Sequence, residues 1–140
     1  LGGYLGEVKA GQRAASHISP LIVAKDGNPF LGLGAAGGSR IPSSIVAVIS
    51  RIVDQGYDLE QAMGMPRVQP IDGGIDIEFT TNEGFTLADS AYFSELGHNV
   101  TVQRKPAKFG RIHAVMKDSN NGGWVGVADS DWEGSADSPK

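Results

Sequence analysis

The chain has 140 residues, of which 40% are hydrophobic and 20% are charged, and its formal net charge is −4. This length supports one domain with a hydrophobic core, and the negative charge balance argues against a nucleic-acid-binding surface. The absence of cysteine excludes disulfide bonds and thiolate chemistry, and no apolar run reaches the length of a membrane span. The composition therefore indicates a globular domain with no nucleic-acid partner and no membrane span.

The N-terminal third of the chain predicts an arm, a β-hairpin and a glycine-rich turn. Residues 1–15 are rich in glycine and alanine without a clear period, and we interpret them as an N-terminal arm. An apolar run from Pro20 to Lys25 predicts a buried strand, and Asp26-Gly27 predicts a tight turn into a second strand that begins at Pro29. The stretch from Gly32 to Ile41 then predicts a turn between that second strand and a helix.

Two helices are predicted after the glycine turn. Ser39 is a plausible N-cap of the first helix, and Pro42 fits its first turn, where a missing N–H costs little. One face of this helix carries apolar residues at helical spacing, namely Ile41, Ile45, Val48, Ile49 and Ile52. Gly56 is a good C-terminal stop, and the segment from Asp58 to Gln61 resembles a capping box that opens a second, short helix.

The rest of the chain predicts one further helix among four strands. The helix starts at Thr86 and ends at Gly97, and residues 130–140 form a polar tail. The strands are expected at Ile75–Phe79, Asn99–Gln103, Arg111–Lys117 and Trp124–Ala128. Because strands precede and follow the helices in hairpins rather than alternating singly with them, the pattern favours an α+β layered fold with a largely antiparallel sheet.

The glycine turn is the strongest candidate for a functional site. The first amides of a helix have no internal partner, and glycine lets another molecule approach the backbone closely. Such a turn can bind an anion, or an oxygen that becomes negative during a reaction. Because the start of one hairpin strand lies beside the end of the other, we expect Ser16 and His17 to lie close to Gly37 and Gly38. A hydroxyl and an imidazole would then converge on a helix N-terminus, as in a binding pocket.

Other interpretations of the same motifs compete with this one. The glycines could serve only the close packing of a helix on a sheet. The string from Gly32 to Gly37 matches the dinucleotide-binding fingerprint, but a second helix is predicted where that motif needs a strand. His98 and His113 have no partner at metal-ligand spacing, so neither a metal site nor a cofactor is predicted.

Several ordered motifs together resemble the γ-glutamyltranspeptidase family, in the C-terminal part of its small subunit. Gly11 to Pro20 is similar to the family's Gly-x-Arg-x-x-Ser-Ser-x-Ser-Pro, and Lys25 to Gly27 to its Lys-Asp-Gly hairpin. Gly34 to Ile41 is similar to its Gly-Ser-Pro-Gly-Gly-Ser-Arg-Ile, and Ala62 to Arg67 to its Ala-x-x-x-Pro-Arg. The family's last strand is matched by Gly126 to Asp129.

These enzymes are N-terminal-nucleophile (Ntn) hydrolases, so the resemblance implies part of an αββα sandwich, with residues 16–129 as the C-terminal portion of the small subunit. It also implies acyl transfer from a small γ-glutamyl or other amide substrate. In the family a glycine pair donates N–H groups to the tetrahedral oxyanion, and this role falls on Gly37 and Gly38. Paired serines hold the substrate α-carboxylate, and this role falls on Ser16, with His17 in place of the second serine.

Departures from the family pattern leave the reaction open. The nucleophilic threonine begins the small subunit upstream of this chain, so we expect the 140 residues alone to be inactive. Their expected partner is the upstream part of the same precursor, which is the large subunit and the N-terminal half of the small subunit. Thr80-Thr81 lies downstream of the glycine turn, and Asn82 follows where the family has histidine, so we interpret the pair as strand-end residues.

Three replacements indicate a divergent member of the family. Ala35-Ala36 stands in place of Ser-Pro, His17 in place of serine, and Ser130-Asp131 in place of the usual Pro-Arg. Two alternatives therefore stay open beside γ-glutamyl transfer. One is a related acylase or peptidase on the same scaffold, and the other is a non-catalytic binding or assembly domain.

Overall fold

The computed structural model describes residues 9–13, 16–79, 85–104 and 109–136, and its architecture is α+β, as predicted. Thr80 and Thr81 lie outside the described residues. The elements in chain order are β1 (Leu21–Lys25), β2 (Asn28–Ala36), the 3₁₀ turn η1 (Gly38–Arg40), α1 (Ile41–Val53), α2 (Leu59–Gly64), β3 (Val68–Ile71), β4 (Gly74–Glu78), α3 (Leu87–Glu95), β5 (Val100–Gln103), β6 (Arg111–Lys117) and β7 (Trp124–Ala128).

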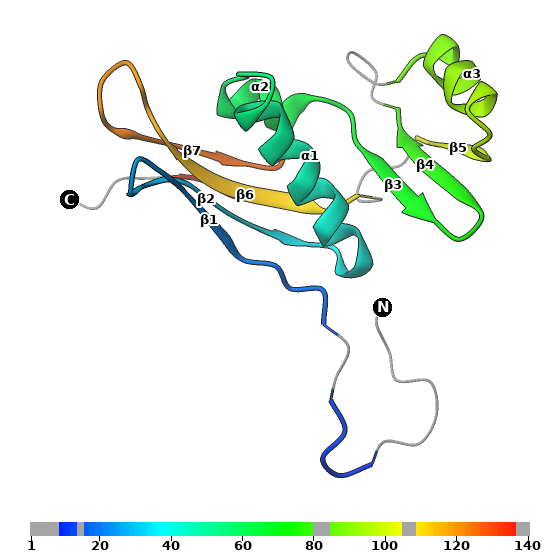
Figure 1. Cartoon of the computed structure of the whole chain (residues 1–140), viewed down its shortest axis with the longest axis horizontal. Helices are drawn as coiled ribbons and strands as arrows, with labels where there is room; N and C mark the ends of the chain where they lie inside the picture. The colour runs from blue at the N-terminus through cyan, green and yellow to red at the C-terminus, as the bar shows by residue number, and fades with distance from the viewer. Residues whose placement is uncertain (1–8, 14–15, 80–84, 105–108, 137–140) are drawn as a thin grey trace.

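The described strands form two sheets (Figure 1). The first has the strand order β1-β2-β6-β7 and is antiparallel throughout. The second has the order β3-β4-β5, in which β3 pairs antiparallel with β4 and β4 pairs parallel with β5. The parallel pair is possible because α3 carries the chain from β4 back to the start of β5. The prediction of largely antiparallel pairing is confirmed, with β4–β5 as the exception.

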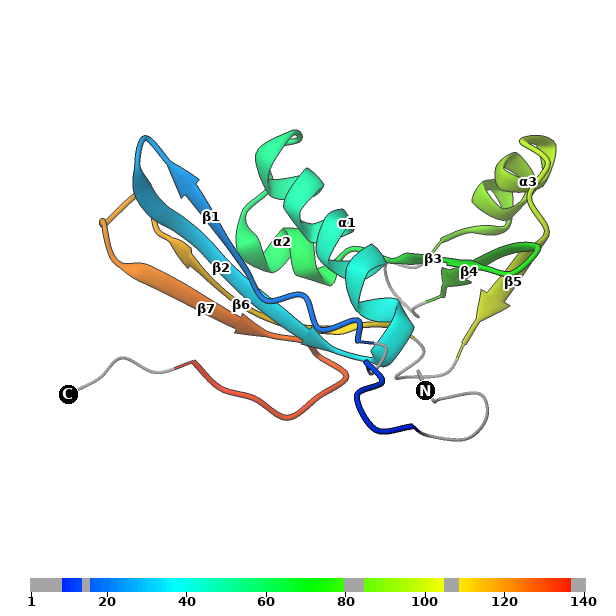
Figure 2. The same ribbon diagram turned by 60° about the horizontal axis from the view of Figure 1, so that its bottom comes forward.

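The main core lies between α1 and one face of the first sheet (Figure 2). Leu31 and Leu33 of β2 alternate with glycines, so both leucines point to the same face and are buried. Ile112 and Ala114 of β6 extend this face. The predicted apolar stripe of α1 is confirmed, because Ile41, Ile45, Val48 and Ile52 are all buried and Ile49 is half-buried. Burial of these side chains anchors the helix whose N-terminus follows the glycine turn.

Four details of the prediction are wrong. β1 was predicted to be a buried strand, but it is the edge strand of the first sheet and only Val23 in it is half-buried. β2 runs on to Ala36 through the predicted turn, because β6 pairs with it over that whole length and compensates for the weak strand preference of glycine. Ser39 is not the N-cap of α1, since it lies inside η1 and Arg40 takes that position without a side-chain hydrogen bond. β3 was not predicted because it contains Pro70, which is tolerated here at the edge of the second sheet.

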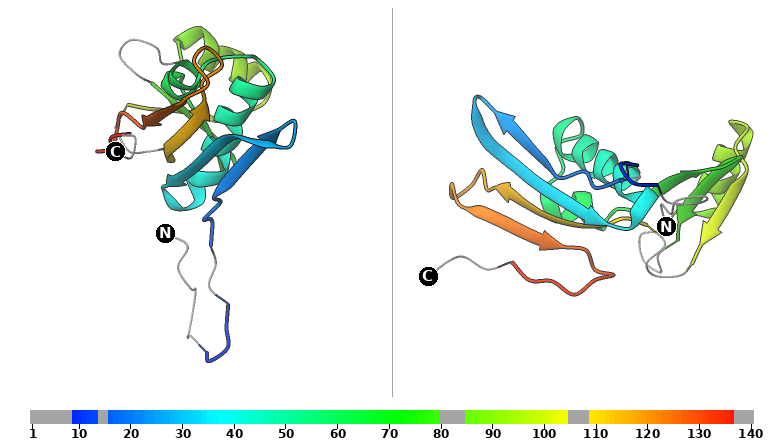
Figure 3. Two further views of the ribbon diagram at one scale, coloured as in Figure 1. Left: turned by 90° about the vertical axis from the view of Figure 1, so that its left-hand side faces the viewer. Right: turned by 90° about the horizontal axis from the view of Figure 1, so that it is seen from below.

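The other face of the first sheet is open over most of its area. In the described part of the chain, the segment that follows β7 turns back and runs along β7 on this side of the sheet, opposite to α1 (Figures 2 and 3). The segment is fixed at Trp132, whose N–H donates to Asp129 O at 3.0 Å and whose ring lies 4.1 Å from the Arg111 guanidinium carbon. A side chain at Gly134 would collide with the ring of His113, so the segment contacts the sheet directly.

Candidate functional site

The glycine turn joins the end of β2 to the start of α1 and has backbone angles that favour glycine. Gly37 has φ 135° and Gly38 has φ 62°, a region in which a Cβ atom is strained. The two positions differ in their surroundings. A Cβ on Gly37 would lie 3.0 Å from Gly110 Cα, whereas a Cβ on Gly38 would have no atom within 4 Å. Gly37 is therefore required for packing, and Gly38 leaves open space above the backbone.

The amides of this turn are available to a ligand. The Gly37 carbonyl accepts from the Arg40 N–H at 3.3 Å, and the Gly38 carbonyl accepts from the Ile41 N–H. Among the described residues, no group accepts a hydrogen bond from the N–H of Gly37 or of Gly38. Both glycines are exposed. The turn thus presents two adjacent N–H donors at the N-terminal end of a helical segment, where partial positive charge accumulates.

Ser16 and His17 precede the hairpin at the same end of the sheet as the turn. The β1–β2 pairing begins with Leu21 opposite Leu33, and continuing that register backward would set His17 level with Gly37. His17 is half-buried, and Ser16 Oγ accepts from the Ile18 N–H at 3.3 Å. Within the described ranges, no hydrogen bond connects either side chain to the turn. The expected closeness of Ser16 and His17 to the turn therefore stays a prediction that rests on the hairpin register.

A buried charge cluster lies beneath this end of the molecule, and sequence reasoning missed it. The Arg67 guanidinium donates to both carboxylate oxygens of Glu78 at 2.7 Å and to Asp129 Oδ2 at 2.5 Å. It also donates to the Gly110 carbonyl at 2.8 Å. All three charged side chains are at least 90% buried. Arg67 and Asp129 both lie in motifs that resemble the family, which was the one sequence feature that could have pointed to them. They are 62 residues apart, so no local pattern predicts that they pair.

Every carboxylate oxygen of the cluster accepts at least one hydrogen bond. Burial opposes the charge on Arg67, but hydrogen bonding to Glu78 and the negative charges of Glu78 and Asp129 outweigh it and raise the pKa of Arg67. Asp129 also accepts from the backbone N–H of Ile112 at 3.2 Å and of Asp131 at 3.0 Å. The cluster therefore connects the chain after α2 with β4, β6 and the end of β7, and its role is structural.

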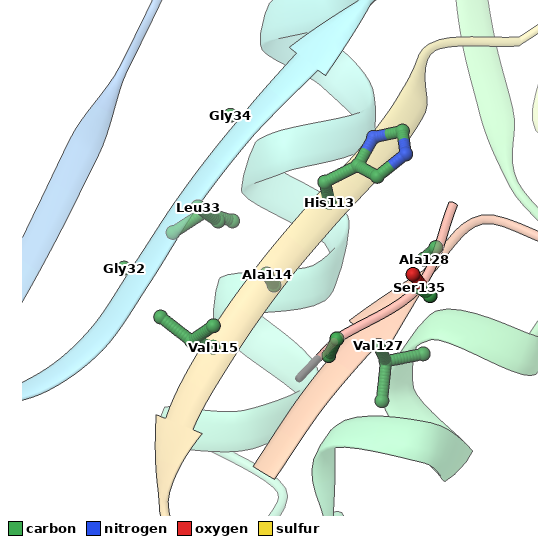
Figure 4. Close-up of a pocket in the computed structure, with 10 residues that line it drawn as sticks. Gly32, Leu33, Gly34, His113, Ala114, Val115, Val127, Ala128 and Ser135 are labelled. Atoms are coloured by element: carbon green, nitrogen blue, oxygen red, sulfur yellow. The ribbon is translucent and has the colours of Figure 1, made fainter. Parts of the chain in front are cut away.

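A shallow pocket of about 420 Å³ lies on the open face of the first sheet (Figure 4). Gly32 and Gly34 of β2, His113 of β6 and Ser135 of the C-terminal segment line it. It includes none of the four predicted site residues. Among the described residues, no three metal-ligating side chains form a group, and no helix is long and apolar enough to cross a membrane.

Comparisons with known proteins agree with this architecture. The family model described as Gamma-glutamyltranspeptidase matches residues 5–138. The solved structure of a mutant of Helicobacter pylori γ-glutamyltranspeptidase superposes with a TM-score of 0.78 at 26% identity, over 94% of this chain and 72% of that chain. The fold is therefore that of an Ntn hydrolase.

Two curated relatives have different names. The glutathione hydrolase proenzyme of Bacillus subtilis (strain 168) is 28% identical over 134 residues, which are 96% of this chain and 22% of that protein. The acylase ACY 1 proenzyme of Pseudomonas sp. (strain V22) is 28% identical over 108 residues, which are 77% of this chain and 18% of that protein. The chain thus spans about a fifth of the length of these relatives. The chain belongs to the γ-glutamyltranspeptidase family, as a divergent member.

Proposed function

We propose that this chain is the C-terminal part of the small subunit of a γ-glutamyltranspeptidase-like amidohydrolase or acyltransferase. The observation that carries the proposal is the pair of exposed N–H groups at Gly37 and Gly38, which lack an acceptor among the described residues. They occupy the positions at which the family pattern has its oxyanion glycines. Ser16 and His17 would hold the α-carboxylate of the γ-glutamyl group, each with one hydrogen-bond donor.

The mechanism requires a nucleophile from the upstream part of the precursor. The hydroxyl of an N-terminal threonine attacks the γ-carbonyl carbon, and its own α-amine accepts the hydroxyl proton. The carbonyl oxygen becomes an oxyanion, to which the N–H groups of Gly37 and Gly38 donate. The C–N bond then breaks, the leaving amine takes the proton, and water or an acceptor amine attacks the acyl-enzyme to release the product and the threonine.

The proposal predicts that the 140 residues alone do not turn over a γ-glutamyl-anilide substrate. The complete protein that contains this chain should be active when a threonine nucleophile precedes it. Turnover by the 140-residue chain that is abolished by Thr80→Ala would contradict the proposal. The upstream gene sequence gives an independent test, because the absence of a threonine at a processing site would favour a non-catalytic binding or assembly domain.

Substitution of Gly38 tests the oxyanion role directly. Gly38→Ala forces a side chain onto a backbone with φ 62°, so the backbone should rotate and turn the N–H away from the oxyanion. Loss of an oxyanion donor typically lowers kcat by about 10²–10³-fold, and we expect a decrease of this order in the complete protein. Gly56→Ala is a matched control, because Gly56 has φ 76°, equally open surroundings and a position at the far end of α1. Equal activity of the two variants would refute the oxyanion role.

A related acylase on the same scaffold is the second candidate. It is favoured by His17 and by Ala35-Ala36, which replace polar or rigid residues of the family pattern, and by the similarity to a protein named as an acylase. The two candidates share the oxyanion turn and differ in the acyl group. Comparing kcat/KM for γ-glutamyl amides with that for amides lacking the α-carboxylate separates them.

A further inference from the structure

Gly110 packs against both the glycine turn and the first turn of α1. Its N–H donates to Ser44 Oγ at 3.0 Å, and its carbonyl accepts from Arg67 Nη1 at 2.8 Å. Gly110 and Ser44 are buried, and Ser44 is only 1% exposed. Both backbone groups of Gly110 are therefore held by side chains that are far from it in the sequence.

The contact between Gly110 and the turn leaves no room for a side chain on either partner. A Cβ on Gly110 would lie 2.7 Å from Arg40 O and 2.8 Å from Ser44 Oγ. A Cβ on Gly37 would lie 3.0 Å from Gly110 Cα. Gly37 and Arg40, the two ends of the turn segment, thus both pack against the backbone of Gly110.

Within its own segment the turn is closed by two backbone hydrogen bonds, from Arg40 to Gly37 and from Ile41 to Gly38, and Ser43 Oγ donates to the Arg40 carbonyl at 3.1 Å. Neither η1 nor α1 has a side-chain hydrogen bond at its N-cap. Gly37 and Gly38 also have more conformational freedom than any other residue type would have. An oxyanion site must nevertheless hold its donors in a fixed geometry before the reaction begins, so the constraint has to come from neighbouring groups.

We propose that Gly110 is a positioning residue that sets the backbone of the glycine turn, with Ser44 and Arg67 as the groups that fix it. This inference rests on the proposed function of Gly37 and Gly38 and extends it to a third glycine. Arg67 is itself immobilised by Glu78 and Asp129, so the carbonyl of Gly110 is tied to the buried charge cluster. Gly110 does not touch the substrate in this scheme and acts only through the turn.

The kinetic test uses the complete protein, with active sites counted by a covalent titrant. Gly110→Ala should displace the turn and lower kcat by about 10²-fold, the loss typical of an ångström-scale misplacement, with little change in KM. Ser44→Ala removes the hydroxyl that accepts from the Gly110 N–H, and a smaller loss in kcat is expected. Ser50→Ala is the matched control, because Ser50 lies in the same helix and bonds to Asp54 instead. Its kcat should not change.

A second measurement does not depend on catalysis. Hydrogen–deuterium exchange of the Arg40 and Ile41 amides, which donate to the Gly37 and Gly38 carbonyls, should become faster in the complete protein in Gly110→Ala and in Ser44→Ala, and not in Ser50→Ala. Unchanged exchange in Gly110→Ala and Ser44→Ala, with kcat equal to that of Ser50→Ala, would overturn the inference. Full kcat in Gly38→Ala would instead refute the oxyanion role, and the exchange data would then still decide whether Gly110 sets the turn.

Discussion

Arg67 shows at the scale of one residue how this fold depends on contacts between distant parts of the chain. Its guanidinium binds Glu78, which is 11 residues away, and Asp129, which is 62 residues away. A buried ion pair adds little stability over an apolar pair of the same shape, but removing one partner leaves an uncompensated charge in the interior. Among the described residues, Arg67 is the only cation that forms an ion pair with Glu78 or Asp129. Loss of Arg67 should therefore destabilise the cluster.

Replacing Arg67 should be strongly destabilising. Arg67→Met leaves Glu78 and Asp129 buried without a cation, and the expected loss in the free energy of unfolding is about 3–5 kcal/mol. Arg104→Met is the control, because Arg104 is exposed, its guanidinium carbon lies 4.1 Å from the centroid of the Phe79 ring, and such a contact is worth only about 0.5–1 kcal/mol. Urea unfolding of both variants measures the difference. Similar losses for the two arginines would show that the cluster is not a stabilising centre.

At the scale of the element, α3 depends on its N-terminal capping box. Thr86 Oγ1 and the Thr86 N–H both donate to Asp89 Oδ2 at 2.7 Å, and the Asp89 N–H donates back to Thr86 Oγ1 at 3.2 Å. These hydrogen bonds, first from the hydroxyl and then from the backbone, lower the pKa of Asp89. A carboxylate with a lowered pKa stabilises the folded state above its unfolded pKa of about 3.9, and this contribution is lost as the pH falls through the folded value.

We therefore expect α3 to fray at its N-terminus below about pH 4. Amide exchange of the first turn of α3 should become faster as the pH falls, after correction for the intrinsic rate. Asp89→Asn should abolish this pH response, while Glu95→Gln at the other end of the helix should retain it. An unchanged response in Asp89→Asn would show that another group controls the helix end.

Sequence patterns predicted the elements that are stabilised by residues close to one another in the chain. The apolar stripe of α1, the capping box that opens α2 and the start of α3 at Thr86 depend on residues within one or two helical turns, and all three were predicted. The capping box of α3 was not predicted as such. β3 and the last part of β2 are stabilised by pairing with β4 and β6, so neither has a strong signal of its own. The contacts of Gly110 could not be predicted for the same reason, because its partners Ser44 and Arg67 are 66 and 43 residues away in the sequence. Gly37 and Gly38 were identifiable because glycine pairs before a helix are a local pattern.

At the scale of the whole molecule, the first sheet has one covered face and one open face. Alternation along the strands places Ile22 and Val115 on the open face, opposite to the buried Leu31 and Leu33, and they are 76% and 46% exposed. Gly32 and Gly34 lie on the same face and make it flat. An exposed apolar sheet face of this kind is typical of a surface that another part of a protein covers, and the 134 residues matched in the Bacillus subtilis relative are only 22% of that protein.

The isolated 140-residue chain should therefore self-associate through this face. Light scattering at increasing concentration should give a rising mean mass, because burying Ile22 and Val115 against a second molecule removes apolar area from water. Ile22→Lys should shift the association to higher concentration, since it places a charge on the open face at the edge strand β1. Leu87→Lys is the matched control, because Leu87 is 80% exposed on α3, away from the first sheet. A monomer at every concentration, or an equal effect of the two lysines, would show that the open face is not the surface that drives association.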